Sequence, residues 1–535
     1  MSDILTGSFH EVNVMSRRVR LCCVLMAIAL GVGVSPAWAQ ALPNLNSLRV
    51  RYNTQKSTTK PDGELKAQID QIDKEIAEAT RAGRTGEVRR LFAKGLALLA
   101  GRTWSDADEF QSSLVLRTST VVLDSTQPQT VRLEQIFAPA ITLSQPLTAT
   151  ASIRPATTGT STTPANPPAP AAPAVGLGRF DQIARDLRES PYAMDLDFSK
   201  VPDGIHTLSV EVKEGERLLG TATLRLSVQK GLDGRLRQLD AAASAALADV
   251  RADLRYPGDY VRKINRGIVE LGQFNVASEL TAAEAIATTA KGAKHPFAGR
   301  TGGFERHYVL EGAGEIMPYR LYVPTGYNGT RAFPLIVALH GLGANEDSFM
   351  DGYSKTVPTL AEQRGYIVVA PLGFRVDGFY GFSLSTDATP GDRRRVELSE
   401  QDVMEVLKRV RTDYKIDDSR IYLMGHSMGA IGTWAIAAKH PAIWAALAPF
   451  SGLGNAATIE KFKHIPQIVV HGDADPTVNV NGSRTMVEAM KKQGVDYVYI
   501  EVPGGNHLDM VVPNLPKVFD FFDAKRKTTT PTTQQ

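Results

Sequence analysis

Cysteine is almost absent from this chain, which has only 2 cysteines among its 535 residues. Both, Cys22 and Cys23, lie in an N-terminal segment that we expect to be removed from the mature protein. Without a thiol, the remaining chain has no disulfide, no thiolate metal site and no cysteine nucleophile. Any covalent catalysis in the mature protein must therefore use another side chain.

An excess of charge of either sign is also missing. The 60 basic and 57 acidic residues leave a formal net charge of +3. The chain therefore has no basic footprint for nucleic acid, and we expect no nucleic-acid partner. With 43% hydrophobic and 22% charged residues, the composition is that of an ordinary globular protein, which excludes a collagen-like, wholly disordered or polytopic membrane protein.

The sequence has one long hydrophobic run, and it lies near the N-terminus. Leu21 to Val34 is apolar, follows three arginines and precedes the small-residue site Ala37-Trp38-Ala39. This pattern predicts a signal peptide over residues 1–39, cut before Gln40. The alternative, a membrane anchor, needs about 20 apolar residues, and this run has about 14. We therefore expect a secreted or periplasmic protein with no membrane span after cleavage.

The chain before residue 299 shows three kinds of pattern. Helical spacing of apolar residues, with one break, predicts a helical hairpin region over 40–102. Period-two patterns predict a small β-sandwich over 103–230, interrupted by a Pro/Ala/Thr-rich insertion at 155–176 that cannot form a packed core. A further helical stretch over 231–298 is expected to link the sandwich to the next domain.

From residue 299 to 524 the signals alternate between strand and helix. Buried apolar runs separated by helical stretches are typical of a mostly parallel sheet wrapped by helices, so we expect the α/β fold class here. Before these runs, Arg306–Leu310 and Tyr319–Val323 predict an antiparallel pair of strands. Residues 525–535 are expected to be a disordered tail. The apolar runs are Leu335–Leu339, Tyr366–Ala370, Ile421–Met424, Ile468–Val470 and Tyr497–Val502.

A serine lies between one of these runs and a helical segment. Gly425-His426-Ser427-Met428-Gly429 directly follows Ile421–Met424 and directly precedes an alanine-rich stretch. Strand, sharp turn and helix are the context of a nucleophile elbow, in which glycines allow the two backbones to approach closely. The sequence therefore predicts Ser427 as a catalytic nucleophile.

A serine nucleophile needs a base, and the base needs an acid to hold its tautomer. Two carboxylates, Asp473 and Asp475, follow the run Ile468–Val470, and we favour Asp475 because Pro476 fixes an extended backbone after it. His507 follows the last apolar run in a glycine-rich loop, so we predict it as the base. The neighbouring His426 is interpreted as a packing residue.

An ester or amide carbonyl also needs hydrogen-bond donors for its developing negative charge. His340-Gly341-Leu342-Gly343 ends the run Leu335–Leu339, and its glycines let a backbone N–H approach a substrate. We predict the amides of Leu342 and Met428 as the oxyanion hole, with Gly341 as the alternative to Leu342.

Five motifs follow one another in this half of the chain: Tyr319-Arg320-Leu321-Tyr322-Val323-Pro324, Leu339-His340-Gly341-Leu342-Gly343, Gly425-His426-Ser427-Met428-Gly429-Ala430, His471-Gly472-Asp473-Ala474-Asp475 and Gly505-Asn506-His507. Together they resemble the α/β-hydrolase superfamily. More narrowly, they are similar to secreted esterases of the polyhydroxybutyrate depolymerase and feruloyl esterase type, and to prolyl-oligopeptidase-like predicted peptidases. The resemblance implies an α/β-hydrolase fold and serine esterase chemistry on Ser427, Asp475 and His507.

Four aromatic residues stand in the long connection 373–392: Phe374, Phe379, Tyr380 and Phe382. They either line a substrate pocket or pack the loop onto the domain, and the sequence favours neither. Shortly after them, Ser399 and Asp402 have the spacing of a helix cap, which we prefer to a second catalytic acid.

The resulting hypothesis is a secreted serine carboxylesterase that hydrolyses aryl, acyl-sugar or polyester bonds of a small-molecule or polymeric substrate. Two alternatives are a prolyl-oligopeptidase-like serine peptidase, and an N-terminal polymer- or envelope-binding module with the hydrolase as passenger. No histidine and carboxylate spacing indicates a metal site, so we expect neither a metal nor another cofactor.

Overall fold

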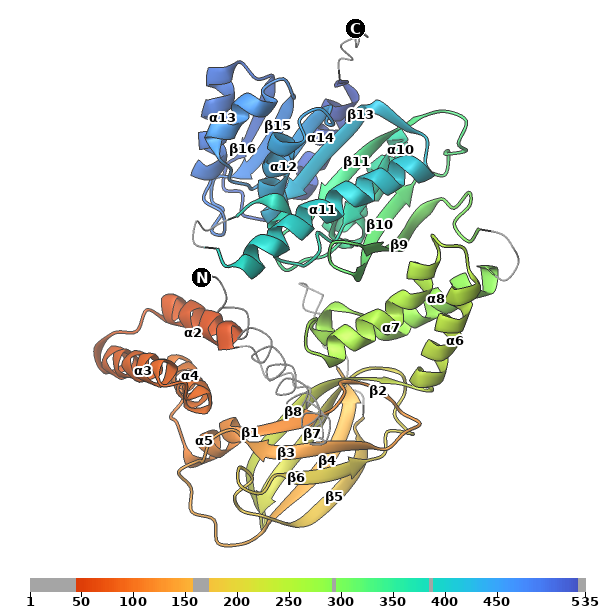
Figure 1. The fold of residues 1–535 in the computed structure, drawn as a ribbon. Coiled ribbons are helices and arrows are strands. Elements are labelled where there is room, and N and C mark those ends of the chain that lie inside the picture. Colours follow the sequence, from red (N-terminus) through yellow and green to blue (C-terminus); the bar gives the residue numbers. More distant parts are fainter. Residues whose placement is uncertain (1–44, 157–172, 291–294, 384–387, 528–535) are drawn as a thin grey trace, which may run out of the picture. The chain divides into compact units, whose positions relative to one another are not determined.

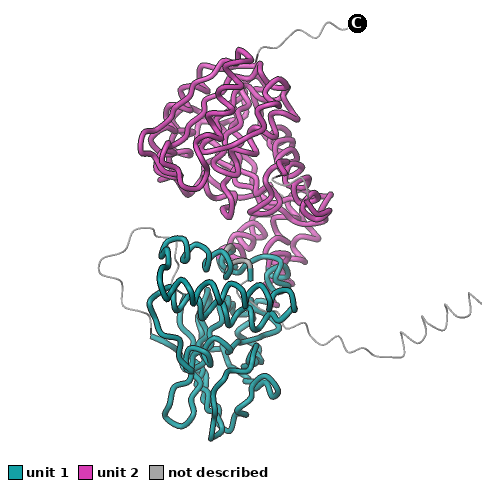
Figure 2. Tube along the Cα trace, turned by 90° about the vertical axis from the view of Figure 1, so that its left-hand side faces the viewer, with its two compact units in different colours: residues 1–232, 261–277 teal, residues 233–260, 278–535 magenta. Residues whose placement is uncertain are grey.

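The computed structural model describes residues 45–156, 173–290, 295–383 and 388–527. The predicted signal peptide over 1–39, most of the insertion 155–176 and most of the tail 525–535 therefore lie outside the described residues. The chain divides into two units, Met1–Leu232 with Val261–Ala277, and Asp233–Tyr260 with Ser278–Gln535 (Figure 2).

The first unit begins with three helices, α2 (Leu45–Thr59), α3 (Gly63–Arg81) and α4 (Thr85–Leu99). Helices α3 and α4 bury the apolar faces from which the hairpin was predicted, among them Ile69, Ile72 and Leu91. Helix α2 adds Tyr52, whose ring meets Phe92 edge-on at 5.4 Å between ring centroids. A β-carbon at Gly95 would lie 2.5 Å from the Tyr52 ring, so this glycine makes room for the third helix.

Two sheets follow in the same unit (Figure 1). One has three strands in the order β1-β3-β6, and the other has five in the order β2-β8-β7-β4-β5. Strand β4 alternates buried Leu147, Ala149 and Ala151 with more exposed residues, as expected for a strand with one face on a core. The elements are α5 (Asp106–Ser113), β1 (Leu114–Thr118), β2 (Val122–Asp124), β3 (Gln129–Gln135), β4 (Leu147–Pro155), β5 (Val175–Ile183), β6 (Tyr192–Leu196), β7 (Gly204–Glu214), β8 (Arg217–Gln229) and η1 (Leu271–Gln273).

Three helices come between these sheets and the next one in the sequence: α6 (Leu232–Ala245), α7 (Arg251–Asn265) and α8 (Val276–Ala290). Residues 233–260 and 278–290 of them belong to the second unit. None of the helices in the described part of the chain has the length and apolar character that a bilayer crossing requires.

An eight-stranded sheet forms the centre of the second unit, in the order β16-β15-β14-β13-β11-β12-β10-β9. Strand β10 pairs antiparallel with both neighbours, and all the other pairs are parallel. The strands are β9 (Gly302–Leu310), β10 (Glu315–Val323), β11 (Phe333–Leu339), β12 (Ile367–Pro371), β13 (Ile416–His426), β14 (Ala446–Phe450), β15 (Gln467–Gly472) and β16 (Tyr497–Val502). This order, with only its second strand reversed, is that of the α/β-hydrolase fold, which confirms the predicted fold class.

Helices cover both faces of this sheet (Figure 1). Along β11, Leu335 and Val337 enter one core, with side chains of α11, α12 and α13, while Ile336 enters the other, with side chains of α9, α10 and α14. Burial on both faces explains why the strands are continuous apolar runs. The remaining elements are α9 (Ser348–Asp351), η2 (Tyr353–Lys355), α10 (Thr356–Arg364), η3 (Phe379–Gly381), α11 (Pro390–Asp413), α12 (Met428–Lys439), η4 (Ala456–Phe462), α13 (Asn481–Gln493) and α14 (Val511–Asp523).

One buried polar pair in this core generates a stability prediction. The indole N–H of Trp434 donates to Gln467 Oε1 at 2.9 Å, and both side chains are buried. Trp434→Phe leaves that buried oxygen unpaired and is expected to lower the free energy of unfolding by about 1–3 kcal/mol. Adding Gln467→Leu removes the unpaired amide, so the double variant is expected to recover part of the loss in urea unfolding. If the double variant instead lost as much unfolding free energy as the two single variants together, this account of the Trp434–Gln467 pair would be wrong.

Candidate active site

Ser427 occupies a sharp turn between β13, which ends at His426, and α12, which begins at Met428. Its backbone has φ 57° and ψ −117°, a conformation that costs a non-glycine residue free energy and is held only where the surroundings impose it. The sheet imposes it here, because the Ser427 N–H donates to the carbonyl of Phe450 in β14 at 2.9 Å.

The glycines on either side of the serine allow the close crossing of strand and helix. A β-carbon at Gly425 would overlap the carbonyl of Gly429, and one at Gly429 would overlap the carbonyl of Leu339 in β11. At both positions any side chain would clash with a neighbouring backbone, which is why an elbow of this kind requires glycine there.

The loops after the last two strands bring a carboxylate and an imidazole together. Asp475 follows β15 and His507 follows β16, and His507 Nδ1 lies 2.7 Å from Asp475 Oδ2. The other carboxylate oxygen of Asp475 accepts the N–H groups of Thr477 and Val478 at 2.8 and 2.9 Å. Asp473 instead accepts the Gly504 N–H, so the carboxylate that contacts His507 is that of Asp475.

The surroundings of Asp475 keep it ionised. Burial opposes the charge, but hydrogen bonds from His507 and from the amides of Val478 and Thr477 outweigh burial and lower the pKa of the carboxyl group. An ionised acid beside Nδ1 holds the N–H on that nitrogen and leaves Nε2 of His507 as the proton acceptor.

Two further histidines adjoin this pair. His426 Nε2 lies 2.8 Å from the backbone oxygen of His507, its Nδ1 lies 3.0 Å from the Tyr353 hydroxyl, and the two imidazole centroids are 4.7 Å apart. His471 Nε2 is 3.3 Å from Asp475 Oδ2. Burial lowers the pKa of both histidines, to about 4 for His426.

These two histidines add hydrogen bonds to the site without adding charge. His426 was interpreted as a packing residue, and it is buried, but it also holds the main chain of the His507 loop. Its place beside Ser427 at a strand end was the available sequence signal for such a contact.

The loop after β11 lies against the elbow. A β-carbon at Gly341 would be 3.5 Å from the Ser427 β-carbon. The N–H groups of Gly343 and Ala344 already donate, to Val376 and to Gly341. Gly341 and Leu342 thus remain the candidates on this loop for an oxyanion donor, and Met428 remains the candidate at the first residue of α12.

In the described part of the chain, the Ser427 hydroxyl forms no hydrogen bond with His507. Catalytic hydrogen bonds in ligand-free structures are often long and tighten when substrate binds, so the base remains a candidate on geometry. His507 keeps some exposure, 15% of its side chain, whereas the side chain of Asp475 has none.

The aromatic residues of the connection after β12 differ in burial. Phe374 and Tyr380 are 7% and 0% exposed and belong to the core on one face of the sheet. Phe379 and Phe382 are half-buried, so they remain the candidates for substrate contact. Residues 384–387 of this connection lie outside the described part of the chain.

The capping interpretation of Ser399 and Asp402 is wrong. Helix α11 begins earlier, at Pro390, and Thr389 caps it together with Asp392. Asp402 instead accepts the N–H groups of Gly373 and Phe374 at 2.6 and 2.9 Å, and Ser399 accepts that of Tyr380 at 3.0 Å. These two buried side chains hold the aromatic connection in place, which local spacing along a helix cannot reveal.

Residues 311–518 match the family described as "Putative esterase". The recognition of an α/β-hydrolase esterase in this part of the sequence is therefore confirmed, and the match extends over less than half of the 535 residues.

Curated relatives are similar to part of this chain. Feruloyl esterase B of Talaromyces stipitatus is 28% identical over 185 residues, which are 34% of this chain and 47% of that protein. Poly(3-hydroxyalkanoate) depolymerase C of Paucimonas lemoignei is 29% identical over 132 residues, 24% of this chain and 30% of that protein. The chain thus spans less than half the length of either relative. The solved ferulic acid esterase AmCE1/Fae1A of Anaeromyces mucronatus is 17% identical with a TM-score of 0.35, over 42% of this chain and 90% of that one.

The buried His426 generates a pH prediction. Its pKa of about 4 lies below the value of about 6.5 for histidine in an unfolded chain. The unfolded state therefore binds more protons between these values, and stability present above pH 6.5 is lost as the pH falls toward 4, by about 3 kcal/mol. In His426→Gln, whose amide does not titrate, unfolding free energies measured from pH 7 to 4 are expected to fall less steeply.

The matched control is the exposed His464, for which His464→Gln is expected to keep the slope of the parent protein. If His426→Gln also kept that slope, burial of a neutral His426 would not be its cause.

Proposed function

We propose that the second unit is a serine carboxylesterase with Ser427 as nucleophile, His507 as base and Asp475 as the acid that orients the base. The observation that carries the proposal is the 2.7 Å contact between His507 and an ionised Asp475, at strand ends beside the strained Ser427. The match of this segment to an esterase family supports it.

In the proposed acylation step, His507 Nε2 takes the proton of the Ser427 hydroxyl while Ser427 Oγ attacks the ester carbonyl carbon. The backbone N–H groups of Met428 and of Leu342, or alternatively Gly341, donate to the carbonyl oxygen as its charge develops. The ester C–O bond then breaks, and the alcohol leaves with the proton from His507.

In the proposed deacylation step, a water gives its proton to His507 and attacks the acyl group on Ser427. The tetrahedral intermediate collapses, the Ser427 Oγ–carbon bond breaks, and the proton returns from His507 to Ser427. Asp475 stabilises the imidazolium in both steps, for which its lowered pKa is suited.

The substrate class is an ester of aryl, acyl-sugar or polyester type, small or polymeric. Relatives support this range by name, since they include feruloyl esterases, a bifunctional acetylxylan esterase/xylanase and a poly(3-hydroxyalkanoate) depolymerase. The half-buried Phe379 and Phe382 are the proposed substrate contacts on the protein.

The alternatives have less support. A prolyl-oligopeptidase-like peptidase usually gates its site with a propeller, and the sheets of the first unit in the described residues have three and five strands. The alternative of a polymer- or envelope-binding first unit with the hydrolase as passenger is opposed by the complete set of Ser427, Asp475 and His507 in the second unit. We retain export to the periplasm or the medium as part of the proposal, on the strength of the sequence pattern over 1–39 alone.

Removal of the nucleophile is the first test. Ser427→Ala is expected to lower kcat/KM on short p-nitrophenyl esters by about 10⁴-fold or more, because no other hydroxyl takes its place. Ser419→Ala, at the far end of the same strand β13, is the matched control and is expected to leave the rate unchanged. Full activity of Ser427→Ala would sink the proposal.

The two neighbouring carboxylates test the assignment of the acid. Asp475→Asn presents an amide to His507 Nδ1 and favours the wrong tautomer, so kcat is expected to fall by about 10³–10⁴-fold. Asp473→Asn only weakens the acceptor for Gly504 and is expected to cost less than about tenfold. The reverse order of effects in steady-state kinetics would assign the acid to Asp473.

A further inference from the structure

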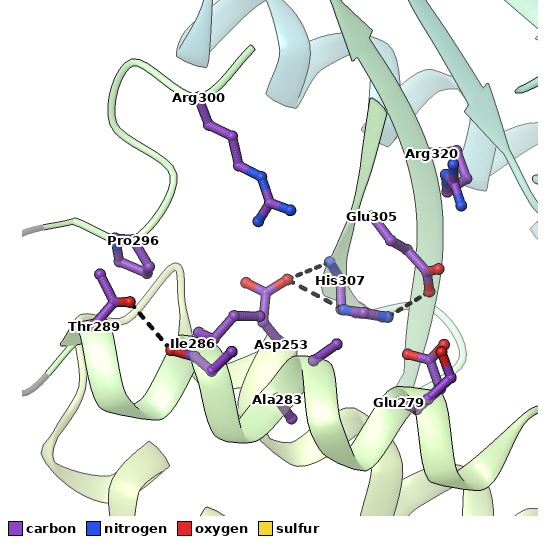
Figure 3. A pocket seen from close by; sticks show the side chains of 13 residues that line it. Asp253, Glu279, Ala283, Ile286, Thr289, Pro296, Arg300, Glu305, His307 and Arg320 are labelled. Carbon is purple, nitrogen blue, oxygen red and sulfur yellow. Dashed lines mark hydrogen bonds and ion pairs between the residues drawn. The ribbon is translucent and has the colours of Figure 1, made fainter. Parts of the chain in front are cut away.

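A cavity of about 320 Å³ in the second unit contains a cluster of titratable side chains that the proposed triad does not use (Figure 3). Helix α8 and strands β9 and β10 contribute to its lining. Glu279 of α8 and Glu305 and His307 of β9 each offer one ligand atom, and these atoms lie within 4.8 Å of one another.

We propose that this cluster binds a divalent metal ion through Glu279, Glu305 and the Nε2 atom of His307. The proposal is independent of the esterase chemistry at Ser427. No spacing pattern in the sequence indicates this site, because Glu279 stands on a different element from the other two residues and reaches them only in the fold.

His307 is oriented as a metal-binding histidine is expected to be. Its Nδ1 lies 3.2 Å from Asp253 Oδ1, which also accepts the His307 backbone N–H at 2.8 Å. Its ring packs on the ring of Tyr256, 3.7 Å between centroids. In this structure the other ring nitrogen, Nε2, donates to Glu305 Oε1 at 2.8 Å, as Figure 3 shows, and a metal ion would take the place of that proton. A carboxylate behind the histidine is the usual outer partner of such a ligand.

Glu305 pairs with His307 at 2.8 Å, and Arg300 and Arg320 line the same cavity, so Glu279 is the acid of the cluster that lacks an ion pair in the described part of the chain. Arg306 pairs with Asp253 at 3.4 Å, and Arg320 pairs with Asp347 at 2.8 Å and with Asp351 at 3.3 Å. Glu279 has no hydrogen bond or ion pair to any other residue that the structure describes. A divalent ion between Glu279 and Glu305 would supply the missing positive charge.

A separate carboxylate points to the same conclusion. Glu346, on the loop after β11, is 6% exposed, and its Oε2 is buried without a hydrogen-bond partner. Among charged groups, Glu305, Asp347 and His307 act on this carboxyl group most strongly. Burial raises the pKa of this carboxyl group well above its ordinary value, and a cation in the cluster would favour its charged form.

The donor set selects the kind of ion. Two carboxylates and one imidazole suit a first-row divalent ion such as Zn²⁺ or Mn²⁺, whereas Ca²⁺ and Mg²⁺ prefer oxygen ligands alone. Three protein ligands leave coordination positions that open into the cavity. The ion would join α8 to β9, so its binding is expected to stabilise the second unit.

The test uses the full chain after chelator treatment and dialysis, titrated with Zn²⁺ and separately with Mn²⁺ in a calorimeter. We expect one equivalent of Zn²⁺ to bind and to raise Tm by a few degrees. Glu279→Gln is the most informative variant, because it removes a ligand oxygen without breaking another described contact. It is expected to weaken Zn²⁺ binding by about 100-fold or more, since a lost ligand costs at least as much as a lost outer partner.

The matched control is Glu284→Gln on the same helix, where Glu284 pairs with Arg235 at 2.6 Å, and it is expected to keep the parent affinity. A second readout is X-ray absorption spectroscopy at the zinc edge, which should show nitrogen and oxygen ligands around the bound Zn²⁺ and no sulfur ligand. Absence of stoichiometric binding of either ion, binding unchanged by Glu279→Gln, or sulfur ligands from Cys22 and Cys23 would each overturn the proposal.

Discussion

The crossing of two backbones at Gly425 and Gly429 is the constraint on which the candidate active site depends. Strand β13 and helix α12 approach so closely that the chain must reverse at Ser427, with φ of 57°. The cost of that conformation is offset by the buried sheet around it, to which the Ser427 amide is tied through Phe450. The serine hydroxyl is thus held at the carboxyl edge of a rigid sheet rather than on a flexible loop.

The same edge sets where the acid and the base stand. Strands β15 and β16 pair in parallel, and a β-carbon at Gly472 would overlap the backbone of Gly505, so the two loops that follow are in direct contact. Asp475 and His507 meet across that contact. Neutral His471 hydrogen-bonds the carbonyl of Val478 at 2.9 Å, and neutral His426 hydrogen-bonds the carbonyl of His507 at 2.8 Å, so each steadies one of the two loops without adding a formal charge.

Which features of the fold and the site could be predicted depends on whether the interacting groups leave a pattern in the sequence. A parallel sheet gathers its strand ends at one edge, so chain order and strand-end position pointed to His507 and to the loop with Asp473 and Asp475. Pro476 then favoured Asp475, which the structure brings into contact with His507. Asp402 was misinterpreted because its partners, the amides of residues 373 and 374, are distant in sequence and only the fold brings them near. Contacts of a side chain with a remote main chain leave no pattern in a single sequence.

The loop after β11 connects the two clusters of the second unit. It carries Gly341 against the elbow and, a few residues later, Glu346 and Asp347 on the side of β9 and β10. Arg320 of β10 holds Asp347 at 2.8 Å, which anchors that end of the loop to the sheet. Arg320 also lines the cavity of the proposed metal site, so that site and the loop that presents the candidate oxyanion amide share one anchoring side chain.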